Sequence, residues 1–163
     1  MKNIALVAHD GRKKELIDWV TYNLNELKNH KLFATGTTGK LISGIEIDAG
    51  YGGGEGVYRR QVVCPLKNNV TCLHSGPLGG DQEIGAMIAN GEIDVLIFFC
   101  DNLITQGHQT DVSALTRLAS LYNIAFATNR TTADMILTSP LLNDESYERI
   151  LPDAINAYKN RKI

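Results

Sequence analysis

The segment SGPLGGDQEIG, residues 75–85, combines a glycine-rich turn with one carboxylate, Asp81. Glycine-rich turns at helix starts bind anions, because free backbone N–H groups and the positive end of the helix dipole point at the ligand. Asp81 carries a negative charge into the same place. Two interpretations are open: the carboxylate caps the helix, or it is a general base that removes a proton from a ligand bound beside it.

A second turn of small residues, TGTTG at 35–39, offers hydroxyls and backbone N–H groups at another helix start. Such groups satisfy phosphate oxygens at little steric cost. Lys13 offers a compensating cation, although a solvated helix lysine is the more common role. Neither a Walker loop nor a G-x-G-x-x-G pattern occurs, so a nucleotide cofactor has no support. The phosphate-binding candidates are Lys13, Thr35, Gly36, Thr37, Thr38, Ser75 and Gly76.

Two histidines, His9 and His108, stand close behind other apolar runs. A lone histidine is usually a surface or core residue, but a neutral imidazole in such a loop can donate to or accept from a ligand oxygen. Asp10, Asp101 and Asp111 lie beside them and would suit a metal. The chain has no H-x-x-x-H, no cysteine cluster and no Ca²⁺-loop spacing. We therefore expect no metal and interpret these aspartates as groups that orient the histidines.

Short apolar runs alternate with helical patterns along the chain, which predicts a single doubly wound α/β domain over residues 1–163. Its five-stranded, mainly parallel sheet would carry helices on both faces. Ligands of such sheets bind beyond the carboxyl ends of the strands, where the candidate residues fall. We expect strands at 3–8, 31–36, 70–75, 94–100 and 124–129, and helices at 12–28, 37–43, 81–90, 111–122, 131–139 and from about 145.

Two local features qualify this pattern. Thr131 and Asp134 fit a capping box at the start of the helix at 131–139. Residues 44–69, which include the flexible stretch GYGGGEG and the strand-like VYRRQVVC, interrupt the alternation. The segment is either a surface loop or hairpin, which is the simpler interpretation, or a mobile lid that brings Arg59 or Arg60 to the site.

Composition limits the remaining function classes. The net charge of −2 argues against a general nucleic-acid or anionic-membrane surface, which needs a basic excess. Three cysteines without a C-x-x-C pattern favour a reduced, cytoplasmic protein. The start MKNIALVAHDG is typical of a first strand rather than of a signal peptide, and no apolar run is long enough to span a bilayer.

The residues resemble the methylglyoxal synthase family. The matching stretches are IALVAHDGRKKEL, LFATGTTGKLIS, SGPLGGDQEIGAMIANGEIDVLIFFCD, DVSALTRLA and NIAFATNRTTAD. The resemblance implies a doubly wound α/β domain assembled as a homohexamer. It also implies a lyase that converts dihydroxyacetone phosphate to methylglyoxal and inorganic phosphate with neither a metal nor an organic cofactor.

The resemblance also implies roles for the candidates. Asp81 looks like the base that removes a proton from the hydroxymethyl carbon, and His108 like the neutral imidazole that polarises the carbonyl. His9 would line the pocket, with the phosphate held by Lys13, the 35–38 turn, Ser75 and Gly76. Asp10, Asp101 and Asp111 resemble supporting carboxylates. Arg117 matches an arginine linked to phosphate inhibition and subunit contacts, so inorganic phosphate is an expected inhibitor.

Two departures from the family pattern leave an alternative open. The loop DNLITQGHQTD, residues 101–111, has Asn102, Gly107 and Thr110 where the family usually has prolines, so it is expected to be looser when unbound. The 44–69 segment is also longer than is usual. The same fold forms regulatory domains that bind phosphorylated metabolites without catalysis, and such a sensor is the competing hypothesis.

Overall fold

The centre of the fold is a five-stranded parallel sheet. We describe a computed structural model, which covers residues 1–52, 59–101, 103 and 109–161. The strands of the sheet are β1 (Asn3–Ala8), β2 (Lys31–Thr35), β5 (Val70–Leu73), β6 (Val95–Phe99) and β7 (Ala125–Ala127). They lie in the order β5-β2-β1-β6-β7, and every neighbouring pair is parallel. This confirms the expected α/β sheet.

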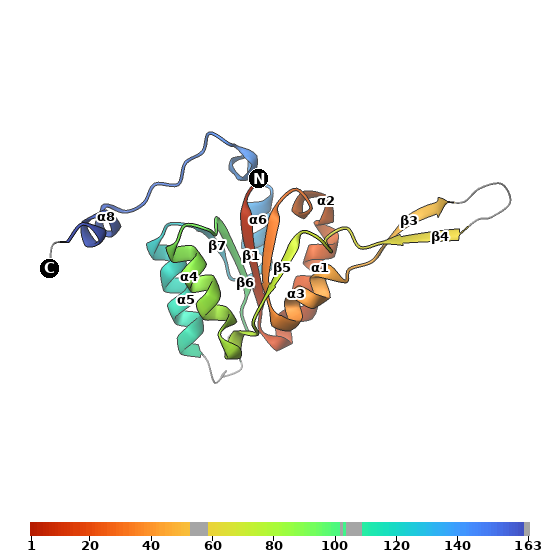
Figure 1. Cartoon of the computed structure of the whole chain (residues 1–163), viewed down its shortest axis with the longest axis horizontal. Helices are drawn as coiled ribbons and strands as arrows, with labels where there is room; N and C mark the ends of the chain where they lie inside the picture. Colours follow the sequence, from red (N-terminus) through yellow and green to blue (C-terminus); the bar gives the residue numbers. More distant parts are fainter. Residues whose placement is uncertain (53–58, 102, 104–108, 162–163) are drawn as a thin grey trace.

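Helices cover both faces of the sheet (Figure 1). Alternate residues of β1 point to opposite faces, as the two-residue period of a strand requires. Ile4 and Leu6 pack into one core cluster, whereas Ala5 and Val7 pack into the other. The first cluster includes α1 (Lys13–Tyr22), α2 (Leu24–Leu27), α3 (Gly36–Ser43), α6 (Arg130–Leu137) and α7 (Pro140–Asn143); the second includes α4 (Gly80–Ala89) and α5 (Gln109–Leu121).

Two of the helix predictions for the body of the molecule need correction. The expected helix at 12–28 is broken at Asn23, whose side chain donates to the carbonyl of Trp19 and whose backbone leaves helical geometry. The expected capping box at Thr131 and Asp134 is wrong. Asn129 caps α6 by accepting from the N–H of Thr132 at 3.0 Å, whereas Asp134 accepts from the indole N–H of buried Trp19 at 2.7 Å. The Asp134 carboxylate therefore makes a long-range hydrogen bond to Trp19 instead of the local capping bond that its spacing from Thr131 predicts.

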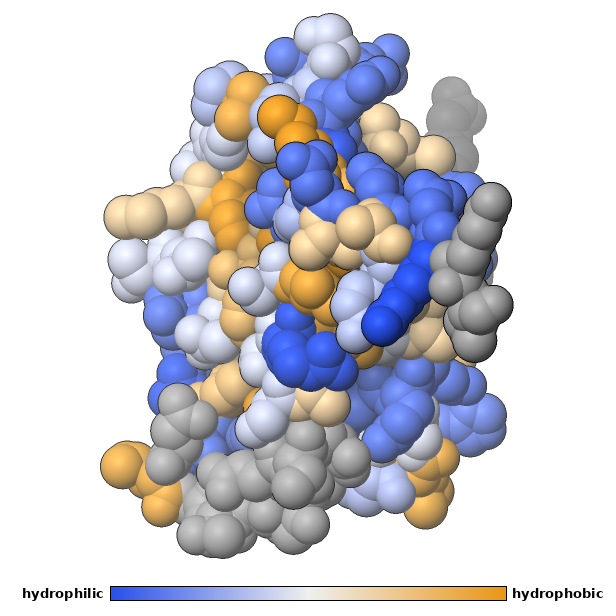
Figure 2. Space-filling view, turned by 90° about the vertical axis from the view of Figure 1, so that its left-hand side faces the viewer, coloured by the Kyte–Doolittle hydropathy of each residue, from blue (hydrophilic) through white to orange (hydrophobic). Residues whose placement is uncertain are grey.

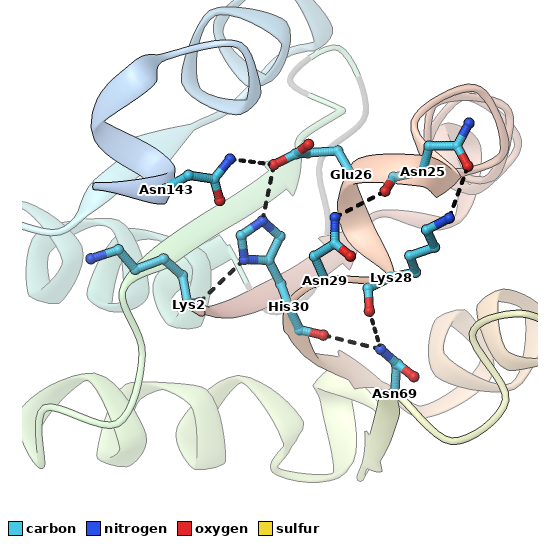
Figure 3. A network of polar contacts seen from close by, with 8 residues as sticks. All are labelled: Lys2, Asn25, Glu26, Lys28, Asn29, His30, Asn69 and Asn143. Atoms are coloured by element: carbon cyan, nitrogen blue, oxygen red, sulfur yellow. Dashed lines mark hydrogen bonds and ion pairs between the residues drawn. The ribbon is translucent and has the colours of Figure 1, made fainter. Parts of the chain in front are cut away.

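A polar network closes the fold at the amino end of β2 (Figure 3). Buried His30 accepts at Nδ1 from the N–H of Lys2 and faces Glu26 through Nε2, at 3.2 and 3.4 Å. Asn143 donates to the same carboxylate at 2.6 Å, and this bond is the main cause of a lowered pKa of Glu26. Asn69 bonds the carbonyls of Lys28 and His30. The network joins segments that are far apart in sequence but contains no member of the predicted site.

The 44–69 segment contains an antiparallel hairpin, β3 (Ile47–Gly52) and β4 (Arg59–Val63). Figure 1 shows that it extends away from the sheet. Within it, Arg60 Nε lies 2.8 Å from a carboxylate oxygen of Asp48. This confirms the hairpin interpretation and a strand within VYRRQVVC; the residues between the two strands lie outside the described part of the chain.

The C-terminal segment leaves the body of the molecule before it forms α8 (Asp153–Lys159) (Figure 1). Residues 144–152 are not helical, so the expected helix from about 145 begins later than predicted. Tyr147, Ile150 and Tyr158 are exposed apolar side chains of this segment. Figure 2 shows hydrophobic residues interspersed with hydrophilic ones over this side of the molecule. Among the described residues, no helix is both long and apolar enough to cross a membrane.

Candidate functional site

A cavity of about 270 Å³ opens at the carboxyl ends of the central strands. Its walls come from the loops that follow β1, β2 and β5 and from the first turn of α4. This is where ligands of open parallel sheets are expected. The predicted residues that line it are His9, Asp10, Lys13, Thr35, Thr37, Thr38, Ser75, Gly76 and Asp81. Residues far apart in sequence are therefore brought to one small space.

One wall of the cavity is the amino end of α3. Thr35 is the N-cap residue, yet its side chain makes no capping bond. The hydroxyl of Thr38 is buried, with the residue 1 % exposed, and has no hydrogen-bond partner among the described residues. An N-terminal helix turn with free N–H groups and buried hydroxyls favours an anion with several acceptor oxygens. This wall is therefore chemically suited to a phosphate group.

Gly36 does not line the cavity; it joins the loop after β2 to the loop after β5. Its N–H donates to the carbonyl of His74 at 3.1 Å, so it is already committed. Its φ is +33°, and a Cβ atom here would lie 2.8 Å from the Cα of Ser75. Only glycine permits this close approach of the two loops. Gly36 therefore shapes the cavity from outside its lining, and its predicted contact with phosphate stays a prediction.

Asp81 also lines the cavity, in the first turn of α4. The helix begins after its N-cap Gly79, so the capping interpretation of Asp81 is wrong. The residue is only 4 % exposed. A Cβ atom on Gly76 would lie 3.0 and 3.1 Å from the two carboxylate oxygens of Asp81. The glycine at position 76 therefore leaves the room that this carboxylate occupies beside the cavity.

His9 is held in one tautomer by the loop after β6. The backbone N–H of Asp101 donates to His9 Nδ1 at 2.8 Å, so Nδ1 carries no proton. The neutral ring then bears its proton on Nε2. Phe98 packs edge-on against the imidazole, with ring centroids 5.1 Å apart. His9 is thus a buried, oriented donor on the cavity wall.

Lys13 supplies positive charge at the mouth of the cavity. It lies at the start of α1, and its ammonium group bonds the carboxylate of Asp10 at 2.5 Å. Asp10 is exposed, whereas the Lys13 side chain is largely covered. The pair therefore holds a cation close to the wall formed by α3, where an anionic group would bind.

Comparison with known proteins shows which family this chain belongs to. Residues 52–128 match the family model of the MGS-like domain. A methylglyoxal synthase of Proteus mirabilis is 47 % identical over 163 residues, which cover 98 % of this chain and 91 % of the relative. The chain belongs to the methylglyoxal synthase family. One from Coxiella burnetii is also 47 % identical, and the alignment covers 100 % of this chain and 99 % of the relative.

A solved structure agrees with the sequence relatives. The crystal structure of methylglyoxal synthase from Elizabethkingia anophelis NUHP1 superposes with a TM-score of 0.78 at 41 % identity, covering 99 % of this chain and 92 % of the other. The family resemblance and the α/β fold predicted from the sequence are therefore confirmed. The matched relatives carry the name of a lyase, which favours an enzyme over a non-catalytic sensor.

Asp101 and Arg117, two further predicted site residues, do not line the cavity. Asp101 contacts His9 through its main chain, while its carboxylate accepts from the N–H of Leu103 at 3.2 Å. The contact with His9 is thus made by the main chain, and the predicted role of the Asp101 carboxylate in orienting a histidine stays a prediction. Arg117 is exposed on α5 and does not line the cavity. His108 and the side chain of Asp111 lie outside the described part of the chain, so their predicted roles stay predictions.

The apolar part of the cavity was not predicted from the sequence. Val7, Ala8, Pro77 and Phe98 complete its lining. Val7, Ala8 and Phe98 belong to strands that were read as core, and only their position at the carboxyl ends of the strands could have indicated a second role. None of the described residues 44–52 and 59–69 lines the cavity, so the lid interpretation of that segment has no support within the described chain.

Cys100 directly follows β6. Burial raises its pKa to about 11, which keeps the thiol protonated and a poor nucleophile at neutral pH. Among the described residues, no group of three or more histidine, cysteine, aspartate or glutamate side chains is arranged to hold a metal ion. The described cavity offers threonine and serine hydroxyls, one lysine, the imidazole of His9 and the buried carboxylate of Asp81.

Proposed function

We propose that this chain converts dihydroxyacetone phosphate to methylglyoxal and inorganic phosphate, acting as one methylglyoxal synthase-like domain over residues 1–163. The observation that carries the proposal is that Asp81 and the phosphate-binding candidates line the same cavity of about 270 Å³. To remove a proton from one end of a three-carbon phosphate ester and phosphate from the other, a site needs a general base at the first end and an anion-binding wall at the second. The membership in the methylglyoxal synthase family supports this choice of substrate.

The reaction begins with binding of the phosphate against the amino end of α3. The N–H groups of the first helical turn after Gly36, the Thr38 hydroxyl and the Lys13 ammonium group stabilise its charge. Ser75 and Gly76 contact it from the neighbouring loop. This arrangement points the hydroxymethyl carbon at Asp81. Fixed donors of this kind need no reorganisation during the reaction, which is why they accelerate it.

Asp81 then takes a proton from the hydroxymethyl carbon. The electron pair of the broken C–H bond moves toward the carbonyl oxygen and gives an enediolate, while Asp81 becomes protonated. The Nε2–H group of His9 is a donor for an enediolate oxygen, and His108 has the same task in the family resemblance. Developing charge is stabilised by donors aimed at it.

Phosphate leaves in the next step. The enediolate electron pair breaks the bond between carbon and the bridging oxygen when this bond stands perpendicular to the enediolate plane, and inorganic phosphate carries the electrons away. The elimination leaves the enol of methylglyoxal once the hydroxymethyl O–H proton has moved to the former carbonyl oxygen. This enol takes up a proton at its terminal carbon, gives up its O–H proton and becomes methylglyoxal. The repulsion between Asp81 and the phosphate is a cost that the α3 wall and Lys13 offset.

The test is to mix the purified protein with dihydroxyacetone phosphate and to follow methylglyoxal and phosphate together. We expect equal amounts of both products. Asp81→Asn should lower kcat by about 10²–10⁴-fold, the usual contribution of a general base, and should leave phosphate binding intact or tighter because a nearby negative charge is removed. Turnover no faster than that of the Asp81→Asn variant would overturn the proposal. Tight binding of a phosphorylated metabolite without turnover would support the sensor instead.

We also propose a homohexamer in the cytoplasm, with inorganic phosphate as an inhibitor that competes for the α3 wall. The exposed apolar residues Tyr147, Ile150 and Tyr158 support an assembly, because a neighbouring subunit would cover them. Exposed Arg117 is available for subunit contacts. Light scattering of the purified protein tests the assembly, and a monomer at micromolar concentration would contradict it.

A further inference from the structure

His74 joins three elements at the site, although it does not line the cavity. It follows β5 directly and precedes Ser75 and Gly76. Its carbonyl accepts the N–H of Gly36, at the start of α3, at 3.1 Å. A Cβ atom on Gly80, at the start of α4, would lie only 2.0 Å from the same carbonyl oxygen. The peptide groups of His74 therefore set how the phosphate wall and the helix of Asp81 meet.

Glu83, on α4, contacts His74 through both of its carboxylate oxygens. One carboxylate oxygen accepts the backbone N–H of His74 at 2.9 Å, and the other lies 2.6 Å from Nδ1 of the His74 ring. The carboxylate thus uses both oxygens on one residue, nine positions earlier in the chain. The bond to the backbone N–H is the main cause of a lowered pKa of Glu83, with the imidazole contact second.

Stability alone does not account for this pair. The side chains of His74 and Glu83 are 71 % and 36 % exposed, and exposed ion pairs contribute little to the free energy of unfolding. A two-oxygen contact, however, fixes direction as well as distance. It holds a backbone N–H at the end of β5 against the same helix that carries Asp81, two residues before Glu83.

We propose that Glu83 is a positioning residue that, with His74, fixes the Ser75–Gly76 loop relative to Asp81. The inference rests on the proposed function for its kinetic consequence, because these two groups would then contact opposite ends of one substrate. Glu83 itself does not line the cavity. Its effect reaches the site through the His74 carbonyl and the two residues that follow it.

The variants Glu83→Ala, Glu83→Gln and His74→Ala test the proposal, with Glu92→Ala as a control for removal of an exposed glutamate after the far end of α4. Glu83→Ala removes both contacts, whereas glutamine keeps an oxygen that accepts the His74 N–H. A displacement of about 1 Å at a site can cost about 10²-fold. We expect Glu83→Ala to raise KM and the dissociation constant of inorganic phosphate by about tenfold, equal to ~1.4 kcal/mol, with a smaller fall in kcat.

Glu83→Gln should restore most of the phosphate affinity, and His74→Ala should lie between wild type and Glu83→Ala because the backbone contact survives. Hydrogen exchange of the Gly36 amide, which donates to His74, should speed up in Glu83→Ala only.

Two results would overturn the inference while leaving the lyase proposal intact. One is a wild-type KM and a wild-type phosphate dissociation constant in Glu83→Ala, and the other is an equal loss in Glu92→Ala. If the wild-type protein shows no turnover, the lyase proposal is wrong. The role of Glu83 is then still decided by the dissociation constant of inorganic phosphate, measured by calorimetry, and by the hydrogen exchange of the Gly36 amide. If Glu83→Ala does not fold, the comparison of Glu83→Gln with His74→Ala decides it: equal, wild-type phosphate affinity in both overturns the proposal.

Discussion

The backbone N–H of Asp101 donates to Nδ1 of His9 across the carboxyl ends of β1 and β6. The contact joins two residues that are 92 positions apart, at 2.8 Å. It selects the tautomer whose proton is on Nε2. A main-chain donor is a robust way to set a tautomer, because a backbone N–H two residues after β6 cannot rotate away as a side chain does.

The first prediction concerns this tautomer. In ¹⁵N-resolved spectra of the imidazole groups, His9 should show a protonated Nε2 and an unprotonated Nδ1. His30, whose Nδ1 accepts the N–H of Lys2, should show the same pattern and serves as an internal reference. His9→Phe keeps a ring against Phe98 but loses the Nε2–H donor, and kcat should fall by about 10²-fold, as for one lost donor to a developing oxyanion. A proton on Nδ1 of His9 would contradict the assignment.

The second prediction concerns the space beside Asp81. In Gly76→Ala the new methyl group would lie 3.0–3.1 Å from both carboxylate oxygens, closer than carbon and oxygen normally pack, so the carboxylate must move. We expect kcat to fall by about tenfold or more, since small displacements of a base are costly, while the protein stays folded. Steady-state kinetics measure this. Gly44→Ala, at the end of α3 and away from the cavity, is the control and should keep the wild-type kcat.

Part of the fold and of the candidate site could be predicted from the sequence. The strand at 94–100 was predicted to within a residue at each end, because β6 is buried on both faces and reads as a continuous apolar run. The loops after β1, β2 and β5 were predicted as one site, because parallel strands bring their carboxyl ends together. Periodicity and small-residue turns were sufficient for both.

Contacts across the sheet could not be predicted in this way. Nothing local in the sequence pairs His9 with the N–H of Asp101, and the i,i+3 spacing of Thr131 and Asp134 favoured a cap that does not form. Gly36 was assigned to phosphate because turn glycines often bind anions, but here its N–H faces His74. In each case a partner distant in sequence competes for a group, and only the three-dimensional structure shows which partner wins.

The third prediction is a pH dependence. The contacts from His74 lower the pKa of Glu83 from its ordinary value of 4.5, so folding favours the ionised carboxylate. Its contribution to stability is therefore fully present above about pH 4.5 and is lost as the pH falls through the lower pKa of the folded state. The melting temperature of wild type should exceed that of Glu83→Gln at pH 7, and the difference should shrink below pH 4.5. A difference that grows on acidification would contradict this sign. Glu26 and Asp144 also have lowered pKa values, but both proteins share them, so their effects cancel in the difference.

The fourth prediction concerns the bond between Trp19 and Asp134. The indole of Trp19 is fully buried between α1 and the sheet, and its N–H group has the Asp134 carboxylate as its acceptor at 2.7 Å. Asp134→Ala leaves this donor unpaired in the core and should lower the free energy of unfolding by about 2 kcal/mol, the cost of losing a hydrogen bond to a charged group. Asp134→Asn keeps an acceptor oxygen and should lose less. The contact between Asp134 and Arg130 is long, at 3.8 Å, and half exposed, so it contributes little to either value. Urea denaturation of the three proteins measures the difference. Equal stability of Asp134→Ala and wild type would contradict the stabilising role assigned to this bond.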